Sequence, residues 1–258
     1  MVRQVLRGKA QIAAICLLAV LSACRPPAVG ETGARAASDA GYVSPPAVTS
    51  AAPAAGHVVL SGEAQAGAQI RLATPDGKAM ATQADGDGRW RLQAPLDGQV
   101  QVFGLSAVNG GRRVQAQGYL LVGPRGQTAL LRAGTAALRL DRPSGSRISV
   151  VDFDSEGGAL LSGWAAAGTD VAIRLDGHLV GDARTDQDGR FVYAWPRLSR
   201  GPHRVEATGV AFTDAIAFDI TPAAPLVDAP LHSQLTLQGF RADWLTPGGG
   251  VQSTILKG

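Results

Sequence analysis

Apolar and polar residues alternate in short runs from about residue 57 onward, and pairs that contain Gly or Asp separate the runs. Strict alternation places successive side chains on opposite faces of an extended backbone, as in half-buried strands. After residue 24 no stretch keeps a 3.6-residue apolar period between capping residues, so the pattern predicts no helix there. Strands are predicted at 58–61, 69–73, 79–83, 89–93, 99–108, 112–122 and 128–132.

The second half of this pattern repeats the first. Residues 60–67, LSGEAQAG, match residues 161–168, LSGWAAAG, and residues 85–90, DGDGRW, match residues 186–191, DQDGRF. Both matches hold at one offset of 101 residues. A repeat that persists over this span predicts two copies of one fold.

Each repeated residue has a physical role in the predicted fold. Gly62 and Gly67 flank a tight bend, where a Cβ would clash or φ must be positive. Asp85 is placed to accept backbone N–H bonds across the turn that follows it. The pattern predicts two apolar cores, the first with Ile70, Leu72, Trp90 and Leu92, and the second with Val171, Ile173, Phe191 and Tyr193.

These motifs resemble those of bacterial Ig-like domains, in which a Ser-Gly pair, a small-residue turn, a strand and Asp-x-x-Gly precede an aromatic strand. The resemblance covers about 57–108 and 148–221. It implies seven-stranded β-sandwiches of the kind that serve as spacers and adhesive modules of surface proteins. Residues 112–140 have no evident counterpart between the copies, so they either complete the first sandwich or add strands to its edge.

The predicted fold class is therefore all-β, with two tandem Ig-like β-sandwiches and a C-terminal β-hairpin. The sandwiches are assigned to 57–145 and 146–222, and the hairpin segment to 223–258. Within that segment, residues 240–245 and 251–256 form the predicted strands around a Pro- and Gly-rich turn. The segment is too apolar to remain unpacked, and the sequence leaves open which sandwich it joins.

The N-terminal pattern is different. Three basic residues precede an uncharged apolar run, which is typical of a secretory signal peptide over residues 1–23. Leu21-Ser22-Ala23-Cys24 resembles the lipobox of bacterial lipoproteins, which implies cleavage before Cys24 and lipidation (palmitate) of its thiol. An ordinary signal peptide with an incidental cysteine, or a buried helix, remains open as an alternative.

Residues 24–56 are rich in Pro, Ala, Ser and Gly, with no apolar period, and are predicted to be a disordered tether after the lipidated cysteine. The alternative is that these residues are merely spare chain and do not serve as a tether. Arg25 follows the cysteine, whereas Asp at this position is the familiar inner-membrane retention signal of lipoproteins in enteric bacteria. By this resemblance the outer membrane, facing the periplasm, is favoured. The inner membrane and the cell surface remain open.

Charge and cysteine content narrow the function. The chain has 24 Lys+Arg against 21 Asp+Glu, and three of the basic residues precede Cys24, so the remainder is balanced at 21 of each. This removes the main argument for a nucleic-acid partner. Because Cys16 and Cys24 are the two cysteines, the folded part has no disulfide and no thiolate ligand.

No catalytic motif stands out. The histidines, at 57, 178, 203 and 232, fall at unrelated points of the repeat, and no Gly-x-Ser-x-Gly, phosphate loop or dinucleotide fingerprint occurs. The sequence therefore predicts a protein that is not an enzyme and has no cofactor.

Two kinds of candidate site remain. The pairs Asp85/Asp87 and Asp186/Asp188 are candidates for calcium, although a hydrogen-bonded turn explains them more simply. Three tryptophans are candidates for a glycan-binding platform, because the face of an exposed ring can stack on a sugar: Trp164, Trp195 and Trp244. The alternative is that their rings pack in the core.

The resulting hypothesis is a cell-envelope lipoprotein, held at a membrane by its N-terminal lipid. It would present Ig-like domains for structural or protein-interaction roles, with an envelope protein or wall component as partner. The alternative is a module that binds glycan or peptidoglycan.

Overall fold

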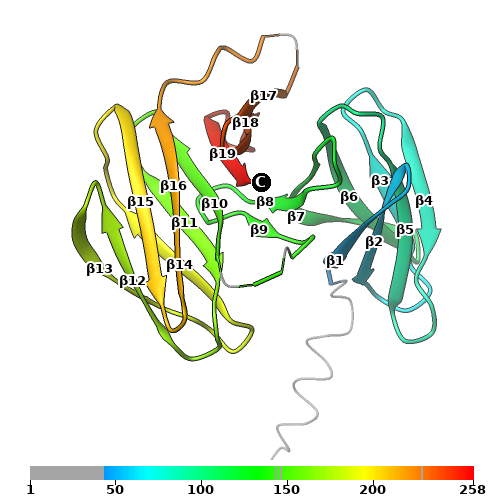
Figure 1. Ribbon diagram of the computed structural model, residues 1–258. Coiled ribbons are helices and arrows are strands. Elements are labelled where there is room, and N and C mark those ends of the chain that lie inside the picture. Colours follow the sequence, from blue (N-terminus) through cyan, green and yellow to red (C-terminus); the bar gives the residue numbers. More distant parts are fainter. Residues whose placement is uncertain (1–43, 143, 146, 228) are drawn as a thin grey trace, which may run out of the picture. The chain divides into compact units, whose positions relative to one another are not determined.

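The computed structural model describes residues 44–142, 144–145, 147–227 and 229–258. The expected signal peptide and the expected lipidation site at Cys24 lie outside these residues. The described residues form strands β1 to β19 and contain no helix, which confirms the all-β fold class (Figure 1). Within the same residues, no helix of the length and apolarity needed to cross a membrane occurs.

The first sandwich packs two antiparallel sheets face to face. One sheet has the order β1 (Ala47–Ala54), β2 (His57–Glu63), β5 (Arg89–Pro95). The facing strands have the order β4 (Ala79–Gln83), β3 (Gln69–Ala73), β6 (Gln101–Asn109), β7 (Arg112–Val122). The predicted core is confirmed, because its four residues are buried in one cluster: Ile70, Leu72, Trp90 and Leu92.

The second sandwich repeats this arrangement. Its first sheet contains β14 (Arg190–Trp195), β11 (Ala159–Trp164) and β10 (Arg147–Asp154). Its second sheet has the order β13 (His178–Arg184), β12 (Asp170–Leu175), β15 (Gly201–Gly209), β16 (Phe212–Ile220). Val171, Ile173 and Phe191 are buried in its core and Tyr193 packs against them, as predicted.

The repeated Ser-Gly pair is explained by packing. A Cβ on Gly62 would lie 2.0 Å from the Ala47 carbonyl oxygen and 2.4 Å from the Trp90 ring. A Cβ on Gly163 would lie 2.3 Å from the Arg147 carbonyl oxygen and 2.4 Å from the Phe191 ring. Each copy therefore uses glycine where the first strand of the sandwich and the core aromatic ring approach the same backbone position.

Strand β1 corrects the predicted boundary of the first sandwich. It was expected inside the disordered tether of residues 24–56, but it pairs antiparallel with β2 along its whole length. Small residues conceal its alternation, and the register shift between Val48 and Ser50 breaks the period. Pro53 is tolerated because β1 is an edge strand, where a missing N–H need not cost a ladder bond.

Residues 112–140 both complete the first sandwich and extend its edge. Strand β7 pairs with β6 as β16 pairs with β15, so this segment does have a counterpart in the second copy. Two further strands, β8 (Thr128–Leu131) and β9 (Leu138–Arg139), then continue the sheet beyond β7.

The C-terminal segment joins the second sandwich. The predicted hairpin is confirmed as β18 (Gly239–Leu245) paired with β19 (Val251–Lys257), and β17 (Leu231–Thr236) adds a further strand. Strand β19 pairs with β10, so the sheet continues in the order β14-β11-β10-β19-β18-β17. The sequence had left this attachment open.

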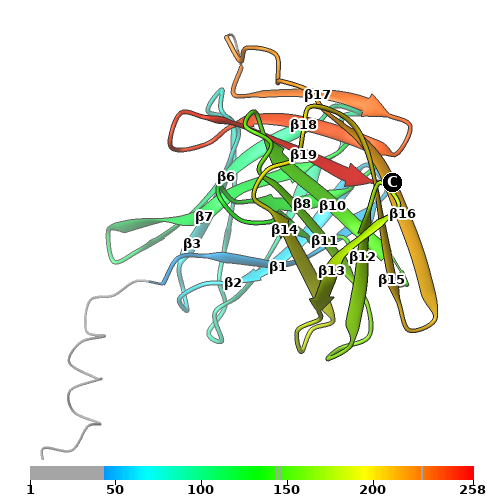
Figure 2. The same cartoon turned by 90° about the vertical axis from the view of Figure 1, so that its left-hand side faces the viewer.

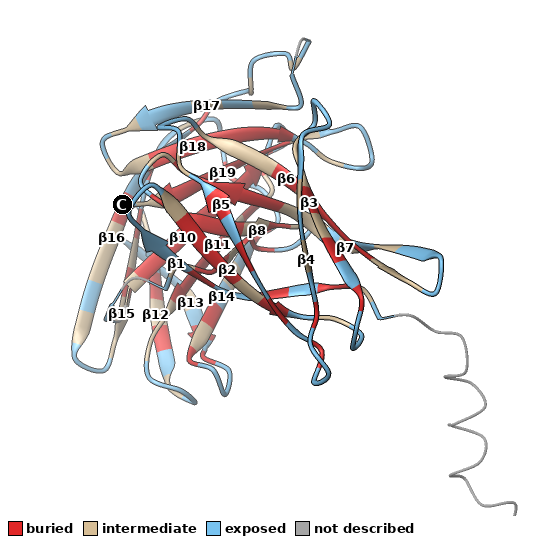
Figure 3. Ribbon diagram, turned by 90° about the vertical axis from the view of Figure 1, so that its right-hand side faces the viewer, coloured by how far each residue is buried: buried red, intermediate tan, exposed pale blue. Residues whose placement is uncertain are grey.

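The two extended sheets meet in a third apolar core. Its buried residues come from both halves of the chain: Leu121, Ala129, Leu131, Ala137, Val150, Phe240, Ala242, Trp244 and Leu256. Figure 3 shows β18 and β19 as largely buried strands. The tandem sandwiches are therefore joined by a common packed core, which the repeat pattern did not predict.

Candidate functional site

The predicted carboxylate pairs lie in two turns of the same geometry. Asp85 Oδ1 accepts backbone N–H bonds from Asp87 at 2.9 Å and Arg89 at 2.8 Å. Asp186 Oδ1 accepts the equivalent bonds from Asp188 at 3.0 Å and Arg190 at 2.8 Å. Among the described residues, no group of three or more His, Cys, Asp or Glu side chains is placed to hold a metal ion. The hydrogen bonds within the turns account for Asp85 and Asp186.

The three candidate tryptophans differ in exposure. Trp195 and Trp244 are 7% and 2% exposed, so their ring faces are not open to a sugar. This corrects the expectation that they form an exposed platform: Trp195 packs in the second core and Trp244 in the third. Trp164 is half-buried, and the Arg142 guanidinium lies 4.5 Å from its ring centroid.

One histidine lies in an arrangement that the sequence did not indicate. His203 Nδ1 is 2.8 Å from Asp176 Oδ2, while its Nε2 is 2.9 Å from the Ser199 carbonyl oxygen and 3.4 Å from the Ser199 hydroxyl. The order Asp-His-Ser resembles a catalytic triad. However, both ring nitrogens face oxygen acceptors, so each is placed to donate.

The electrostatics of this cluster favour the charged imidazole. Burial lowers the pKa of His203, but hydrogen bonds to the Ser199 carbonyl and the Asp176 carboxylate outweigh it, and the net pKa is raised. The pKa of Asp176 is lowered, first by the Arg204 backbone N–H and then by His203. Nε2 lies nearer to the Ser199 carbonyl oxygen, at 2.9 Å, than to the Ser199 hydroxyl, at 3.4 Å, so the geometry fits a structural cluster better than a base poised on a serine nucleophile.

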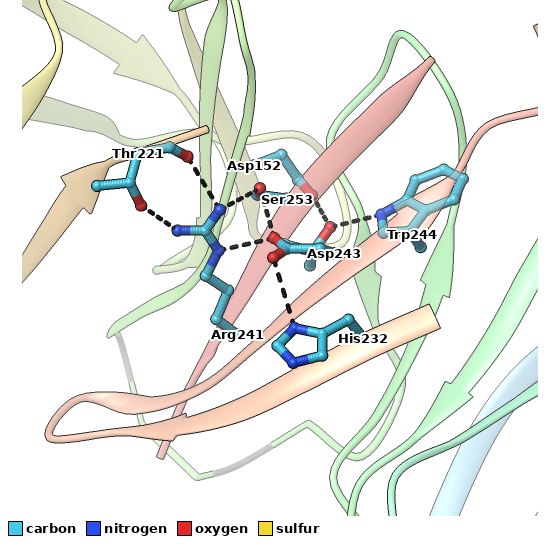
Figure 4. A network of polar contacts seen from close by, with 8 residues as sticks. Asp152, Thr221, His232, Arg241, Asp243, Trp244 and Ser253 are labelled. Carbon is cyan, nitrogen blue, oxygen red and sulfur yellow. Dashed lines mark hydrogen bonds and ion pairs between the residues drawn. The ribbon is translucent and has the colours of Figure 1, made fainter. Parts of the chain in front are cut away.

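A buried polar network lines the third core (Figure 4). Asp152 Oδ1 accepts a hydrogen bond from the Thr254 hydroxyl at 2.6 Å, and Asp152 Oδ2 accepts one from the Ala137 N–H at 2.7 Å. The Trp244 indole N–H donates to the same Thr254 oxygen at 3.1 Å. Burial raises the pKa of Asp152 to about 6, because these hydrogen bonds offset only part of the cost of desolvation.

A second part of the network lies on the opposite face of β18. The Arg241 guanidinium donates to Asp243 at 2.7 Å, to Ser253 at 2.9 Å and to the Thr221 hydroxyl at 2.6 Å. His232 lies 4.0 Å from Asp243 and is the more exposed partner of that pair. Because the charges compensate each other inside the protein, this network fixes the register of the C-terminal strands.

Polar contacts also tie the first half of the chain to the second. Arg139, held by Asp141 at 2.6 Å, donates from Nη1 to the Lys257 carbonyl at 2.6 Å. Arg190 donates to the Ala136 carbonyl at 3.2 Å. Its counterpart in the first copy, Arg89, is exposed, so the second copy has adapted this repeat position to hold the added strands.

A groove lies beside the third core, between the β3–β6–β7 face and the β18–β19 turn. We call it the Phe103 groove; it measures about 550 Å³. Phe103 and Trp244 are among the residues that line it, but both side chains are almost fully buried beneath its floor, Phe103 in the first core and Trp244 in the third. Tyr119 stands edge-on to Trp244, with ring centroids 6.1 Å apart. Arg71, Ser106 and Gln115 add polar groups to the lining.

This composition fits a binding site rather than a catalytic one. An apolar floor with a few placed polar groups is typical of ligand and peptide grooves. Arg71 supplies a positive charge, and Gly104 leaves open space above the sheet. A second hollow of about 720 Å³ shares Phe103 and Pro230 with the groove and extends it past Leu231. The sequence did not indicate this groove, because its walls come from distant segments.

No protein-family model matches the chain, and no curated protein matches it. Among solved structures, the chain is similar to the D0–D1 domain of intimin, with 14% sequence identity, a TM-score of 0.26 and a match over 69% of this chain and 98% of that one. It is also similar to the central fibronectin-III array of RIM-binding protein, with 15% identity, a TM-score of 0.25 and a match over 81% and 74%.

Two further solved structures are longer than the matched region. The match to invasin, a bacterial integrin-binding protein, has 12% identity and a TM-score of 0.22 and covers 84% of this chain. The match to the BSP domain of a biofilm-associated protein has 13% identity and a TM-score of 0.25 and covers 71% of this chain. The chain spans 54% and 30% of those two chains, respectively.

Proposed function

We propose that this chain is a non-enzymatic, lipid-anchored protein of the cell envelope that presents its Ig-like sandwiches to a partner protein or wall component. The observation that carries the proposal is the Phe103 groove, which the first sandwich and the C-terminal strands build together. Its apolar floor and the positive charge of Arg71 fit a partner segment that is largely apolar and carries an acidic group.

The anchor rests on the sequence Leu21-Ser22-Ala23-Cys24. Two or three acyl chains on Cys24 would together bind a bilayer durably. The membrane in this proposal is the outer membrane, with the protein facing the periplasm, because Arg25 rather than Asp follows the cysteine. Replacing Cys24 with Ser tests the anchor. The variant should lose palmitate labelling and leave the membrane fraction, whereas an unmodified sulfur on the native protein would exclude the anchor.

The groove is tested by filling it. Gly104→Leu places a side chain into open space in the groove, since a Cβ there meets no atom within 4 Å and the backbone has no left-handed φ. Gly86→Leu is the matched control, because Gly86 is equally open and lies in a distant turn. Pull-down from solubilised envelopes should recover a partner with wild type and Gly86→Leu, and lose it with Gly104→Leu. Equal recovery by all three would exclude the groove.

A second candidate function is recognition of glycan or peptidoglycan through Trp164. The supporting observation is that this ring is only half-buried and that the Arg142 guanidinium stacks on it, which shows that part of the ring is accessible to a polar group. Wall fragments should change the tryptophan fluorescence of wild type but not of Trp164→Ala. A flat titration of the wild type would exclude this function.

A further inference from the structure

Strand β17 leaves a row of backbone groups available for another strand. It is the terminal strand in the sheet order, and Figure 2 shows it along the upper margin of that sheet. The Leu245 N–H donates to the Pro230 carbonyl at 3.0 Å, and Leu231 stands opposite Trp244. Since bonded and non-bonded pairs alternate in an antiparallel ladder, the N–H and C=O groups of Leu231, Ser233 and Leu235 point away from β18.

The edge lacks the features that usually prevent strand pairing. Three other edges in this protein carry them: β1 contains Pro53 and a register shift, β5 contains exposed Arg91 and Pro95, and β16 contains Asp219. Residues 231–238, LHSQLTLQ, contain no Lys, Arg, Asp, Glu, Pro or Gly. A neutral and regular edge strand of this kind is a template for a further strand.

Large apolar side chains at this edge are exposed. Leu235 is 71% exposed and Leu237 is 103% exposed. Leu231 is half-buried, and it lies on the same face of the sheet as Leu235 because side chains two and four residues apart share a face. Water therefore contacts both the backbone and the leucines of this edge.

We propose that β17 pairs antiparallel with β17 of a second copy of this chain, so that the two sheets become continuous. Centred on Ser233, the pairing sets Ser233 opposite its own copy and Leu231 opposite Leu235. All three residues whose backbone groups point outward then lie in bonded pairs, each exchanging two hydrogen bonds. The leucines meet on one face, and His232 meets Gln234 on the other.

The occupant is a second copy because the strand is complementary to itself. In this register apolar residues face apolar residues, no like charges are opposed, and each copy supplies the same donors and acceptors. A foreign strand would need a matching pattern that nothing in this chain specifies. The inference rests neither on the lipid anchor nor on the Phe103 groove, so its failure would leave the proposed function standing.

The association is measured by sedimentation of the purified full chain over a concentration series. Wild type should form a dimer. Leu235→Lys should weaken it by about tenfold or more, because a charge would be buried opposite Leu231. Ser233→Pro should do the same, because it removes an outward N–H and leaves the ladder to β18 intact. Leu179→Lys is the matched control, since Leu179 is 57% exposed on β13, and it should leave the dimer unchanged.

Cross-linking tests the register. Ser233→Cys should oxidise to a disulfide-linked dimer, because directly opposed residues lie within disulfide reach. Gln234→Cys should not, because its copy would lie two residues out of register. Thermal melting of each variant, which should match wild type, shows that the exposed substitutions leave the fold intact.

Several results would overturn the proposal. They are a wild-type monomer at all concentrations, a dimer that survives both Leu235→Lys and Ser233→Pro, and equal cross-linking at positions 233 and 234. A wild-type monomer whose partner in envelope pull-down is lost on Leu235→Lys would assign the edge to a foreign strand instead, and would also reject self-pairing.

Discussion

Asp152 and Thr254, which are 102 residues apart in the sequence, share a hydrogen bond of 2.6 Å within the pairing of β10 with β19. The bond joins the first strand of the second sandwich to the last strand of the chain. It also places an ionisable group where both extended sheets cover it, and the Asp152 side chain is therefore almost fully buried.

The raised pKa of Asp152 predicts a pH-dependent stability. Because the pKa rises from 3.8 in the reference state to about 6 in the fold, the native state binds the proton more tightly. The stabilising contribution is complete below about pH 4 and is lost as the pH rises through 6, a change of about 3 kcal/mol. When the free energy of unfolding is measured in urea from pH 4 to 7, it should fall less steeply with pH for Asp152→Asn than for wild type. Parallel pH profiles of the two proteins would contradict the assignment.

His203 predicts a second pH dependence of stability, at higher pH than that of Asp152. Its folded pKa is raised above 6.5, so its stabilising contribution is present below about 6.5 and is lost as the pH rises through the folded value. His203→Gln should therefore lose more stability at pH 6 than at pH 9. Proton NMR titration gives the pKa directly, and Asp176→Asn should lower it. An unchanged His203 pKa in that variant would show that the carboxylate does not hold the charge.

Gly62 and Gly163 predict matched effects in the two copies. Alanine at either position would bring a Cβ to within 2.4 Å of the core aromatic ring and of a strand carbonyl, so each substitution should destabilise the fold by about 2–4 kcal/mol. Gly86→Ala is the control, because a Cβ there meets no atom within 4 Å. Thermal melting compares the three. A Gly62→Ala protein with the same melting temperature as Gly86→Ala would refute the packing explanation.

The turn aspartates predict that calcium is not needed for stability. Chelation with EGTA should leave the melting temperature unchanged, because Asp85 and Asp186 already accept two backbone hydrogen bonds each. Asp186→Ala should cost about 1–2 kcal/mol through the loss of those bonds. A melting temperature that rises with added calcium in wild type, but not in Asp186→Ala, would restore the metal as an explanation.

Local pattern predicted much of the fold, because the information was local. The alternation around Ile70 and Val171, the Asp-x-x-Gly turns and the hairpin of residues 240–256 all depend on residues close in sequence. Strand β1 was missed because alanines hide its buried face. Strand β17 was missed as a separate strand because three polar residues separate Leu231 from Leu235, so the alternation starts only at Leu235 and runs on into the turn at Leu237.

The third core and the groove could not be predicted in this way. They depend on the pairing of β10 with β19, and no period in the sequence encodes a partner that lies a hundred residues away. In the segment Arg241, Ala242, Asp243, Trp244, charged and apolar side chains alternate, yet both faces of the strand are buried. Arg241 and Asp243 tolerate burial because they pair with each other and bind Ser253 on the neighbouring strand β19, while Thr221 binds Arg241.

The position of β19 has a consequence for how the chain acquires its structure. The third core cannot close until β19 has been made and has paired with β10. Until then Leu131 and Val150, which are fully buried in the folded protein, lack the packing that β19 provides and are exposed to water. Contacts of such long sequence separation form slowly, and exposed apolar surface invites association with other chains. We therefore expect a chaperone-dependent interval in the biogenesis of this protein, which ends only when β19 pairs with β10.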